Sequence, residues 1–222
     1  MKKLIKLSIS AILTLLFQCA AYSQFCTLDN RFTEVEFFND DQISSEMNVV
    51  YGNADGQDLA MDVYFPSQEN EDLSERPFIM LFHGGSFIGG DRSMMTSTCL
   101  EFAKRGFVAA TVSYRLSDQL TIPARYKGSQ DGHAAMRYIV ENADQYGIDT
   151  DWLFTGGDSA GSIIAISMVF DDQQEWQNRD QMNDLMGDYG LLYSNGNDLE
   201  NTYQIQGVMN NWGSAYIVAL DE

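Results

Sequence analysis

From residue 77 onward, the sequence alternates between short apolar runs and longer segments with helical spacing. The run PFIMLF at residues 77–82 is continuously apolar, which is typical of a central strand covered on both faces. Alternating strands and helices favour a mainly parallel α/β sheet with helices on both faces. The strands expected in this part are residues 77–82, 107–113, 152–154 and 205–209, and the helices are residues 94–105, 124–146 and 162–170.

Two further strand-like segments precede this alternating part. Residues 47–51 and 59–65 are rich in apolar and aromatic side chains, and the turn-forming sequence NADG at residues 53–56 lies between them. We therefore expect an antiparallel hairpin at one edge of the sheet.

Residues 171–204 interrupt the alternation with many Asp, Asn and Gln residues. Within them, Met182, Leu185, Met186 and Tyr189 recur at intervals that indicate one amphipathic helix. Two interpretations stay open. The segment is either a surface helix that seals the sheet or a small cap or insertion over a substrate cleft.

The first 23 residues have the character of a secretory signal peptide. Three lysines precede an apolar run that is short for a membrane span, and small residues lead up to a cleavage point before Gln24. A lipoprotein signal at Cys19 is a weaker match, because large residues precede that cysteine. We expect residues 1–23 to be removed and residues 24–222 to form one domain, exported to the periplasm or the extracellular medium and not bound to a membrane.

The formal net charge of the chain is −19, and removal of the signal lysines makes it more negative. Such a polyanion repels phosphate backbones, so we exclude nucleic acid as a partner. Outside the signal, Cys26 and Cys99 are the two cysteines, and they fit either a disulfide or two unpaired thiols. The sequence has no Cys/His cluster with metal-ligand spacing, and we expect neither a metal nor another cofactor.

The sequence Gly157-Asp158-Ser159-Ala160-Gly161 fits the pattern G-x-S-x-G. This pattern forms a sharp strand-to-helix turn, the nucleophile elbow, which presents a serine hydroxyl as a nucleophile. The serine adopts a strained backbone angle, and the two glycines leave room for the neighbouring strand and helix. An apolar strand before the motif and an apolar helix after it supply the required context, so Ser159 is the candidate nucleophile. The alternative is a tight turn with an incidental serine.

A glycine-rich sequence, LFHGGSFIGGD at residues 81–91, begins at the end of a predicted buried strand. Acyl transfer through a serine creates an oxyanion, and each prepositioned N–H donor that meets it lowers the barrier by about 3 kcal/mol. The backbone N–H groups of Gly84 and Gly85 are the natural donors, with Ala160 of the elbow as a third. His83 is expected to orient the loop and not to act as the base.

Four segments of the chain match one known family. They are HGGS at residues 83–86, SYRL at 113–116, IPARYKGSQDGHAAMRYI at 122–139 and GGDSAGS at 156–162. Together they resemble the α/β-hydrolase carboxylesterases, especially the hormone-sensitive-lipase-like group and bacterial esterases of acylated plant polysaccharides, such as acetyl-xylan and feruloyl esterases. The resemblance implies a carboxylic ester hydrolase of the α/β-hydrolase fold, in which the elbow serine attacks the acyl carbon.

Two positions depart from the pattern of this family. Ser86 and Ser162 stand where many members have glycine, and both are small enough to leave the geometry intact. Arg115 and Asp131 match family positions that look structural, and we expect them to pair near the top of the sheet without a catalytic role.

The base that a catalytic serine requires is missing from its expected place. The chain has two histidines, His83 and His133, and both precede the serine, whereas the family order is Ser, then Asp or Glu, then His. We interpret His133 as a surface or helix-packing residue. Asp221 and Glu222 come too early for the triad, so the acid and the histidine are expected beyond Glu222, in a longer esterase.

This interpretation predicts a sheet that is incomplete at its C-terminal edge, with an unpaired apolar strand there. The chain by itself should fold poorly and turn over slowly, if at all. The expected substrate is a small ester or an acylated carbohydrate. Two alternatives remain open, namely a non-catalytic binding domain on a hydrolase scaffold and a serine peptidase of the same fold.

Overall fold

The computed structural model describes residues 37–67, 75–118, 122–170 and 196–213. The predicted signal peptide, Cys26 and the helix expected around Met182 to Tyr189 lie outside these ranges. Among the helices that are described, none combines the length and the apolar character needed to cross a membrane.

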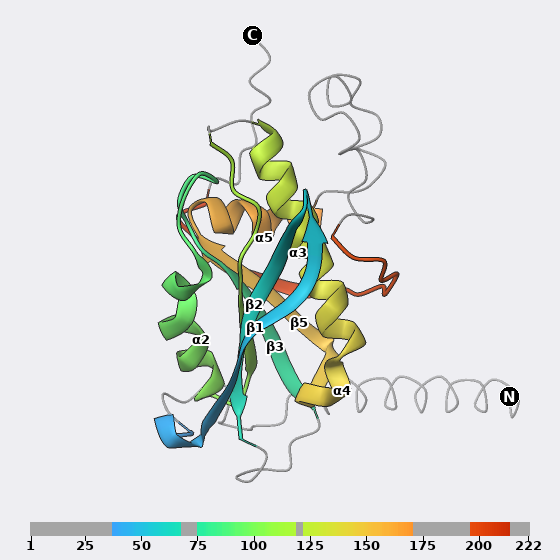
Figure 1. The fold of residues 1–222 in the computed structure, drawn as a ribbon. Helices are drawn as coiled ribbons and strands as arrows, with labels where there is room; N and C mark the ends of the chain where they lie inside the picture. The colour runs from blue at the N-terminus through green and yellow to red at the C-terminus, as the bar shows by residue number, and fades with distance from the viewer. Residues whose placement is uncertain (1–36, 68–74, 119–121, 171–195, 214–222) are drawn as a thin grey trace, which may run out of the picture. The chain divides into compact units, whose positions relative to one another are not determined.

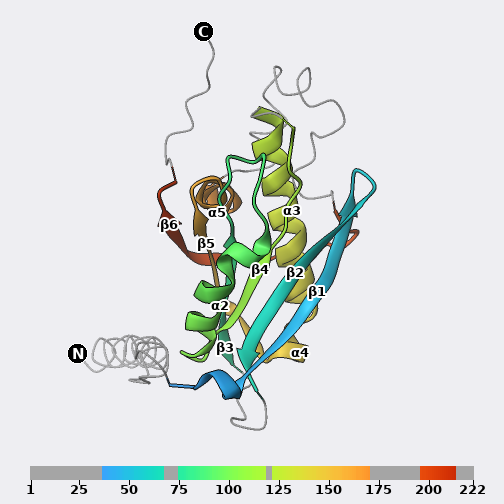
Figure 2. The same ribbon diagram turned by 60° about the vertical axis from the view of Figure 1, so that its left-hand side comes forward.

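Six strands form one sheet in the order β1-β2-β4-β3-β5-β6, with β1 and β6 at its two edges (Figure 2). β1 and β2 form the antiparallel hairpin that the sequence predicts, and β2 also runs antiparallel to β4. β4, β3, β5 and β6 run parallel to one another, which confirms the predicted parallel part of the sheet. The bounds are β1 Ile43–Ala54, β2 Gln57–Pro66, β3 Arg76–Phe82, β4 Val108–Val112, β5 Ile148–Asp158 and β6 Ile205–Asn211.

Helices cover both faces of this sheet (Figure 1). This confirms the prediction of helices on both faces, with α2 packed on one face and α3 and α5 on the other. The predicted helix 124–146 is divided into α3 and α4. The bounds are η2 Asp40–Gln42, η3 Arg92–Met95, α2 Thr96–Ala103, α3 Ile122–Glu141, α4 Ala143–Tyr146 and α5 Ala160–Phe170.

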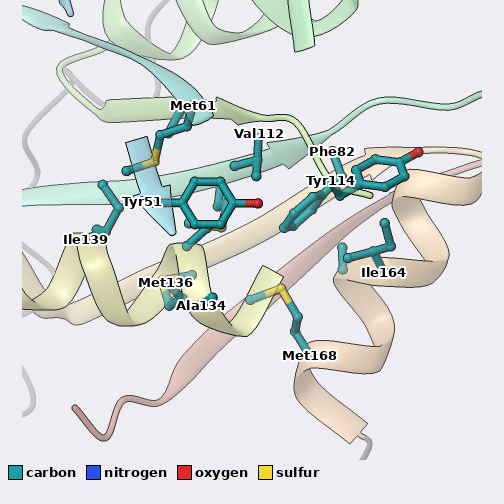
Figure 3. Packing of buried hydrophobic residues seen from close by; sticks show 14 of the residues in the cluster. Tyr51, Met61, Phe82, Val112, Tyr114, Ala134, Met136, Ile139, Ile164 and Met168 are labelled. Atoms are coloured by element: carbon teal, nitrogen blue, oxygen red, sulfur yellow. The ribbon is translucent and has the colours of Figure 1, made fainter. Parts of the chain in front are cut away.

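Strand β3 supplies side chains to both hydrophobic cores because successive residues of a strand point to opposite faces. Phe78, Met80 and Phe82 pack in the larger core with α3 and α5. Ile79 and Leu81 pack in the smaller core with α2. Figure 3 shows the larger core, in which Tyr51 and Met61 of the hairpin, Ile139 of α3 and Ile164 of α5 are labelled. Each large side chain buried in this way contributes about 1.5–3 kcal/mol, and together they fix the strand ends that carry the site.

The second edge strand, β6, pairs only with β5 within the described residues. Its other side has no strand neighbour in this part of the chain, and the predicted incompleteness of the sheet stays a prediction. Its burial pattern is mostly intermediate, with Val208 packed against the larger core and Met209 against the smaller one.

Candidate active site

Ser159 lies at the sharp turn between the end of β5 and the start of α5. Its φ of 52° is in the left-handed region, which a non-glycine residue adopts at a cost of order 1 kcal/mol or more. Its neighbour Ala160 is buried, whereas Ser159 itself is exposed. The local structure is the strand, strained turn and helix that the G-x-S-x-G pattern predicts.

The two glycines of the elbow allow it to lie against the end of β3. A Cβ atom on Gly157 would lie 2.5 Å from the carbonyl oxygen of Phe82, and one on Gly161 would lie only 2.1 Å from the same atom. Both contacts are with backbone, which cannot rotate aside as a side chain would. Glycine is therefore required at both positions for the observed packing.

Residues of the elbow are tied to the end of β6, which the sequence did not predict. The amide of Ser159 donates to the carbonyl of Asn211 at 2.8 Å, and Asn211 Nδ2 donates to Asp158 Oδ1 at 3.1 Å. The hydroxyl of Ser162 lies within hydrogen-bond distance of the carbonyls of Asn211, at 2.9 Å, and of Gly157, and it accepts from the Asn211 amide at 3.0 Å. The serine that departs from the family pattern thus links the elbow to the neighbouring strand.

The glycine-rich loop, defined here as residues 83–91, lies directly beside the elbow. A Cβ atom on Gly84 would lie 3.4 Å from the Cβ of Ser159. Within the described residues, the N–H groups of Gly84 and Gly85 donate to no protein acceptor. Ala160 is the first residue of α5, where the N–H has no acceptor inside the helix. The structure thus places Gly84 and Ala160 beside the candidate nucleophile, and Gly85 follows Gly84 in the adjacent loop.

His83 is buried at the start of this loop and is engaged there. Its Nδ1 donates to the carbonyl of Gly84 at 2.7 Å, while the Tyr114 hydroxyl donates to the carbonyl of His83 at 2.8 Å. The two rings also stack, with centroids 4.4 Å apart. Burial lowers the pKa of His83, which favours the neutral ring at pH 7. These are the contacts expected of a residue that orients the loop. Tyr114 was not among the predicted site residues.

The middle of the loop holds a strained conformation. Gly85, Ser86, Phe87 and Gly90 all have positive φ angles, of which only the glycines adopt such values readily. Inside the loop, the amides of Ile88 and Gly89 donate to the carbonyl of Gly85 at 3.0 and 3.1 Å. Phe87 is buried, and its carbonyl accepts a hydrogen bond from the amide of Ser117, outside the loop. The loop is therefore shaped by both its own bonds and its surroundings.

His133 lies beside the end of α5 that is opposite the elbow. It is 1% exposed on α3, and its Nδ1 is hydrogen-bonded to the Tyr203 hydroxyl. Together with Met168 and Val169 of the last turn of α5, it lines a cavity of about 660 Å³. Ser159 precedes the first turn of α5, and a helix of this length measures about 16 Å. Of the two interpretations offered for His133, packing between elements is confirmed and a surface position is wrong.

Burial of His133 predicts a specific acid sensitivity. Burial first, and the Arg137 guanidinium second, lower its pKa from 6.5 to about 3. Between these values the unfolded state binds a proton that the folded state does not, so the free energy of unfolding falls as the pH falls. The expected loss of unfolding free energy is about 2 kcal/mol from pH 7 to pH 5.

The substitution His133→Asn, which keeps a polar atom near the Nδ1 position, should remove this loss. Urea unfolding of the full-length wild type and the variant at pH 7 and pH 5 measures it. If the free energy of unfolding depended equally on pH in the two proteins, the prediction would be contradicted.

Arg115 and Asp131 form the pair that the sequence predicts. Arg115 Nη2 lies 2.8 Å from Asp131 Oδ1, and the Arg115 amide donates to Oδ2 at 2.7 Å. Both residues are buried, and Asp55 adds a second carboxylate 3.2 Å from Arg115 Nη1. The pair joins α3 to the segment that follows β4, which is a structural role.

The possible disulfide between Cys26 and Cys99 remains a prediction, because Cys26 lies outside the described residues. Cys99 is fully buried in α2, and burial raises the pKa of its thiol. Such a thiol is a poor nucleophile at neutral pH.

Comparisons with known proteins agree with this geometry. The model of the BD-FAE family matches residues 61–222, which is most of the chain. The chain belongs to the BD-FAE family. Esterase LipI of Mycobacterium tuberculosis is 34% identical over 118 residues, covering 49% of this chain and 36% of that protein. Ethyl acetate hydrolase of Pseudomonas putida is 33% identical over 112 residues, covering 50% and 34%. This BD-FAE chain therefore spans about a third of the length of these curated relatives.

Solved structures identify the fold of this BD-FAE member. Esterase B of Lactobacillus rhamnosis aligns with a TM-score of 0.56 and 21% identity over 91% of this chain and 57% of that one. Butyrate-bound esterase Est2 of Thermogutta terrifontis aligns with a TM-score of 0.58 and 23% identity over 75% and 52%. The fold is the α/β-hydrolase fold, as the sequence resemblance implies.

Proposed function

We propose that this protein is a serine-dependent carboxylic ester hydrolase. The observation that carries the proposal is the contact between the two motifs, with a Cβ on Gly84 only 3.4 Å from the Cβ of Ser159. The names of the relatives, an esterase and an ethyl acetate hydrolase, support the same reaction.

In this reaction the Ser159 oxygen attacks the acyl carbon while a base takes the hydroxyl proton. The oxyanion that forms accepts hydrogen bonds from the backbone N–H groups of Gly84, Gly85 and Ala160. Collapse of the intermediate expels the alcohol, which takes up the proton, and leaves an acyl-serine. Water then attacks the acyl carbon, releases the carboxylic acid and restores the serine.

The proposed reaction also needs a base that takes the Ser159 proton and an acidic residue that pairs with that base. Among the described residues, no side chain accepts a hydrogen bond from the Ser159 hydroxyl, and His83 and His133 are both engaged elsewhere. We propose that the histidine and the Asp or Glu are encoded after Glu222. In support, the family match continues to residue 222 and the chain covers 36% of esterase LipI. Residues 1–222 alone are then expected to be inactive.

The proposed substrate is a small ester or an acylated carbohydrate that reaches an exported enzyme. Export rests on the signal-like residues 1–23. The exposed position of Ser159 leaves the nucleophile accessible to such a substrate.

Hydrolysis of p-nitrophenyl acetate and of p-nitroacetanilide by the full-length protein tests the proposal. We expect the ester to be cleaved faster than the anilide, and Ser159→Ala to lower kcat for the ester about 10⁴-fold or more. Preferential cleavage of the anilide would instead favour a serine peptidase. A folded full-length protein that cleaves neither substrate would favour a binding domain on this scaffold.

A further inference from the structure

The far end of the glycine-rich loop is held by a residue outside the recognised motifs. At this end, Asp91 caps η3 by accepting the Ser93 amide at 2.8 Å. Arg92 follows as the first residue of η3. Its carbonyl accepts the buried Thr111 hydroxyl of β4 at 2.7 Å, which fixes the backbone directly after the loop.

The guanidinium of Arg92 contacts three further residues. Its Nε lies 2.9 Å from Asp62 Oδ1 of β2, as an ion pair. Its Nη1 donates to Ser113 Oγ, just after β4, at 3.0 Å. Its Nη2 donates to Asn48 Oδ1 of β1. A planar guanidinium can donate to two acceptors in fixed directions while it pairs with a carboxylate, whereas an ammonium group is a point charge on a flexible stem.

The partners of Arg92 are themselves fixed in place. Asp62 is 3% exposed, and its Oδ1 also accepts the Asn48 amide at 2.8 Å. Asn48 has a φ of 60° and lies where the register between β1 and β2 shifts, between Glu46 and Val49. The guanidinium therefore ties the end of the loop to the irregular part of the edge hairpin.

The strained loop needs such an anchor. Ser86 and Phe87 hold left-handed φ angles that persist only when the surroundings impose them. At the near end, the buried His83 and Tyr114 impose the conformation. At the far end, the contacts of Arg92 hold the backbone directly after the loop. Amide donors must be aligned with the oxyanion, and a displacement of about 1 Å costs on the order of a hundredfold in rate.

We propose that Arg92 is a positioning residue for the proposed ester hydrolysis. Its guanidinium anchors the far end of the glycine-rich loop and so holds the N–H groups of Gly84 and Gly85 beside the nucleophile. The inference rests on the proposed function and adds a determinant of its rate.

Hydrolysis of p-nitrophenyl acetate by full-length variants tests this inference. Arg92→Gln is expected to lower kcat by about tenfold to a hundredfold with KM within about twofold, because the lost alignment matters mainly in the transition state. Arg92→Lys keeps a positive charge near Asp62 but cannot serve Ser113 and Asn48 at once. It is therefore expected to lose as much kcat as Arg92→Gln.

Two matched variants separate positioning from stability. Arg105→Gln removes an ion pair with Glu101, 3.0 Å long, at the end of α2, and is expected to keep the wild-type kcat. The double variant Asp62→Asn/Arg92→Gln leaves no unpaired buried carboxylate, so it should fold even where Arg92→Gln alone does not. It is expected to show the same loss of kcat.

A folded Arg92→Gln or double variant with wild-type kcat would overturn the inference, and so would full rescue by Arg92→Lys. Absence of hydrolysis by the wild-type full-length protein would overturn the proposed function together with this inference. Normal wild-type hydrolysis with an unchanged Arg92→Gln kcat would overturn the inference alone.

Discussion

Gly161→Ala in the full-length protein is expected to lower both stability and esterase activity strongly. The new Cβ would lie 2.1 Å from the Phe82 carbonyl oxygen, 2.5 Å from the Phe82 carbonyl carbon and 2.7 Å from the His83 carbonyl oxygen. All three are backbone atoms, at the end of β3 and the start of the glycine-rich loop, so α5 or this backbone must move. Overpacking of this kind costs about 1–3 kcal/mol or more of unfolding free energy.

The same movement separates the elbow from the glycine-rich loop, since His83 opens that loop. A shift of about 1 Å between nucleophile and donors is expected to lower kcat about a hundredfold in the fraction that still folds. Thermal unfolding and initial rates on p-nitrophenyl acetate measure the two effects.

Gly89→Ala is the matched control for this substitution. Gly89 belongs to the glycine-rich loop, but a Cβ on it would meet nothing within 4 Å. This variant should keep the wild-type unfolding temperature and the wild-type rate of p-nitrophenyl acetate hydrolysis. If Gly161→Ala were as stable and as active as Gly89→Ala, the close packing of elbow on strand would not be needed for catalysis.

Much of the fold could be predicted because its signals are local. The run at residues 77–82 is apolar on both faces, and β3 is buried throughout its length. The predicted strand 152–154 is longer in the structure, as β5, because Ile148 and residues 155–158 also pair through backbone bonds that side-chain pattern does not report. The predicted helix 124–146 is interrupted at Asn142, and α4 ends at Gly147 with a φ of 66°. Helical spacing alone does not locate such an interruption.

In the candidate site, too, some contacts could be predicted from the sequence and others could not. Ser159 and Gly84 could be predicted as neighbours because each motif carries its own strand and turn, and parallel strands end at one edge of the sheet. Asn211 had no motif, and its bond to the amide of Ser159 depends on β6 lying beside β5. Arg92 depends likewise on partners 21 to 44 residues away in the sequence. Contacts of this kind follow from the register of the sheet and have no sequence pattern.

His133 illustrates an ambiguity that sequence could not resolve. Its helical position fits either a surface or a packed side chain, and the choice depends on which face α3 turns to the sheet. In the structure, His133 is buried on the face of α3 that lines the cavity beside α5. Its neutral imidazole is hydrogen-bonded to the Tyr203 hydroxyl. A histidine next to apolar helix positions is thus a packing residue here and gives no base to the elbow.

Fluorophosphonate labelling of the full-length protein, followed by peptide mapping, tests most directly whether Ser159 is an activated nucleophile. The serine oxygen displaces fluoride from phosphorus only when a base assists and the oxyanion donors are in place. We predict one phosphonyl group per chain, on the peptide that contains Ser159, and no label on Ser159→Ala. Ser86→Gly, which removes another exposed hydroxyl from the adjacent loop, should label fully. A folded, full-length protein that takes up no label, or takes it up at Ser86, would contradict the account.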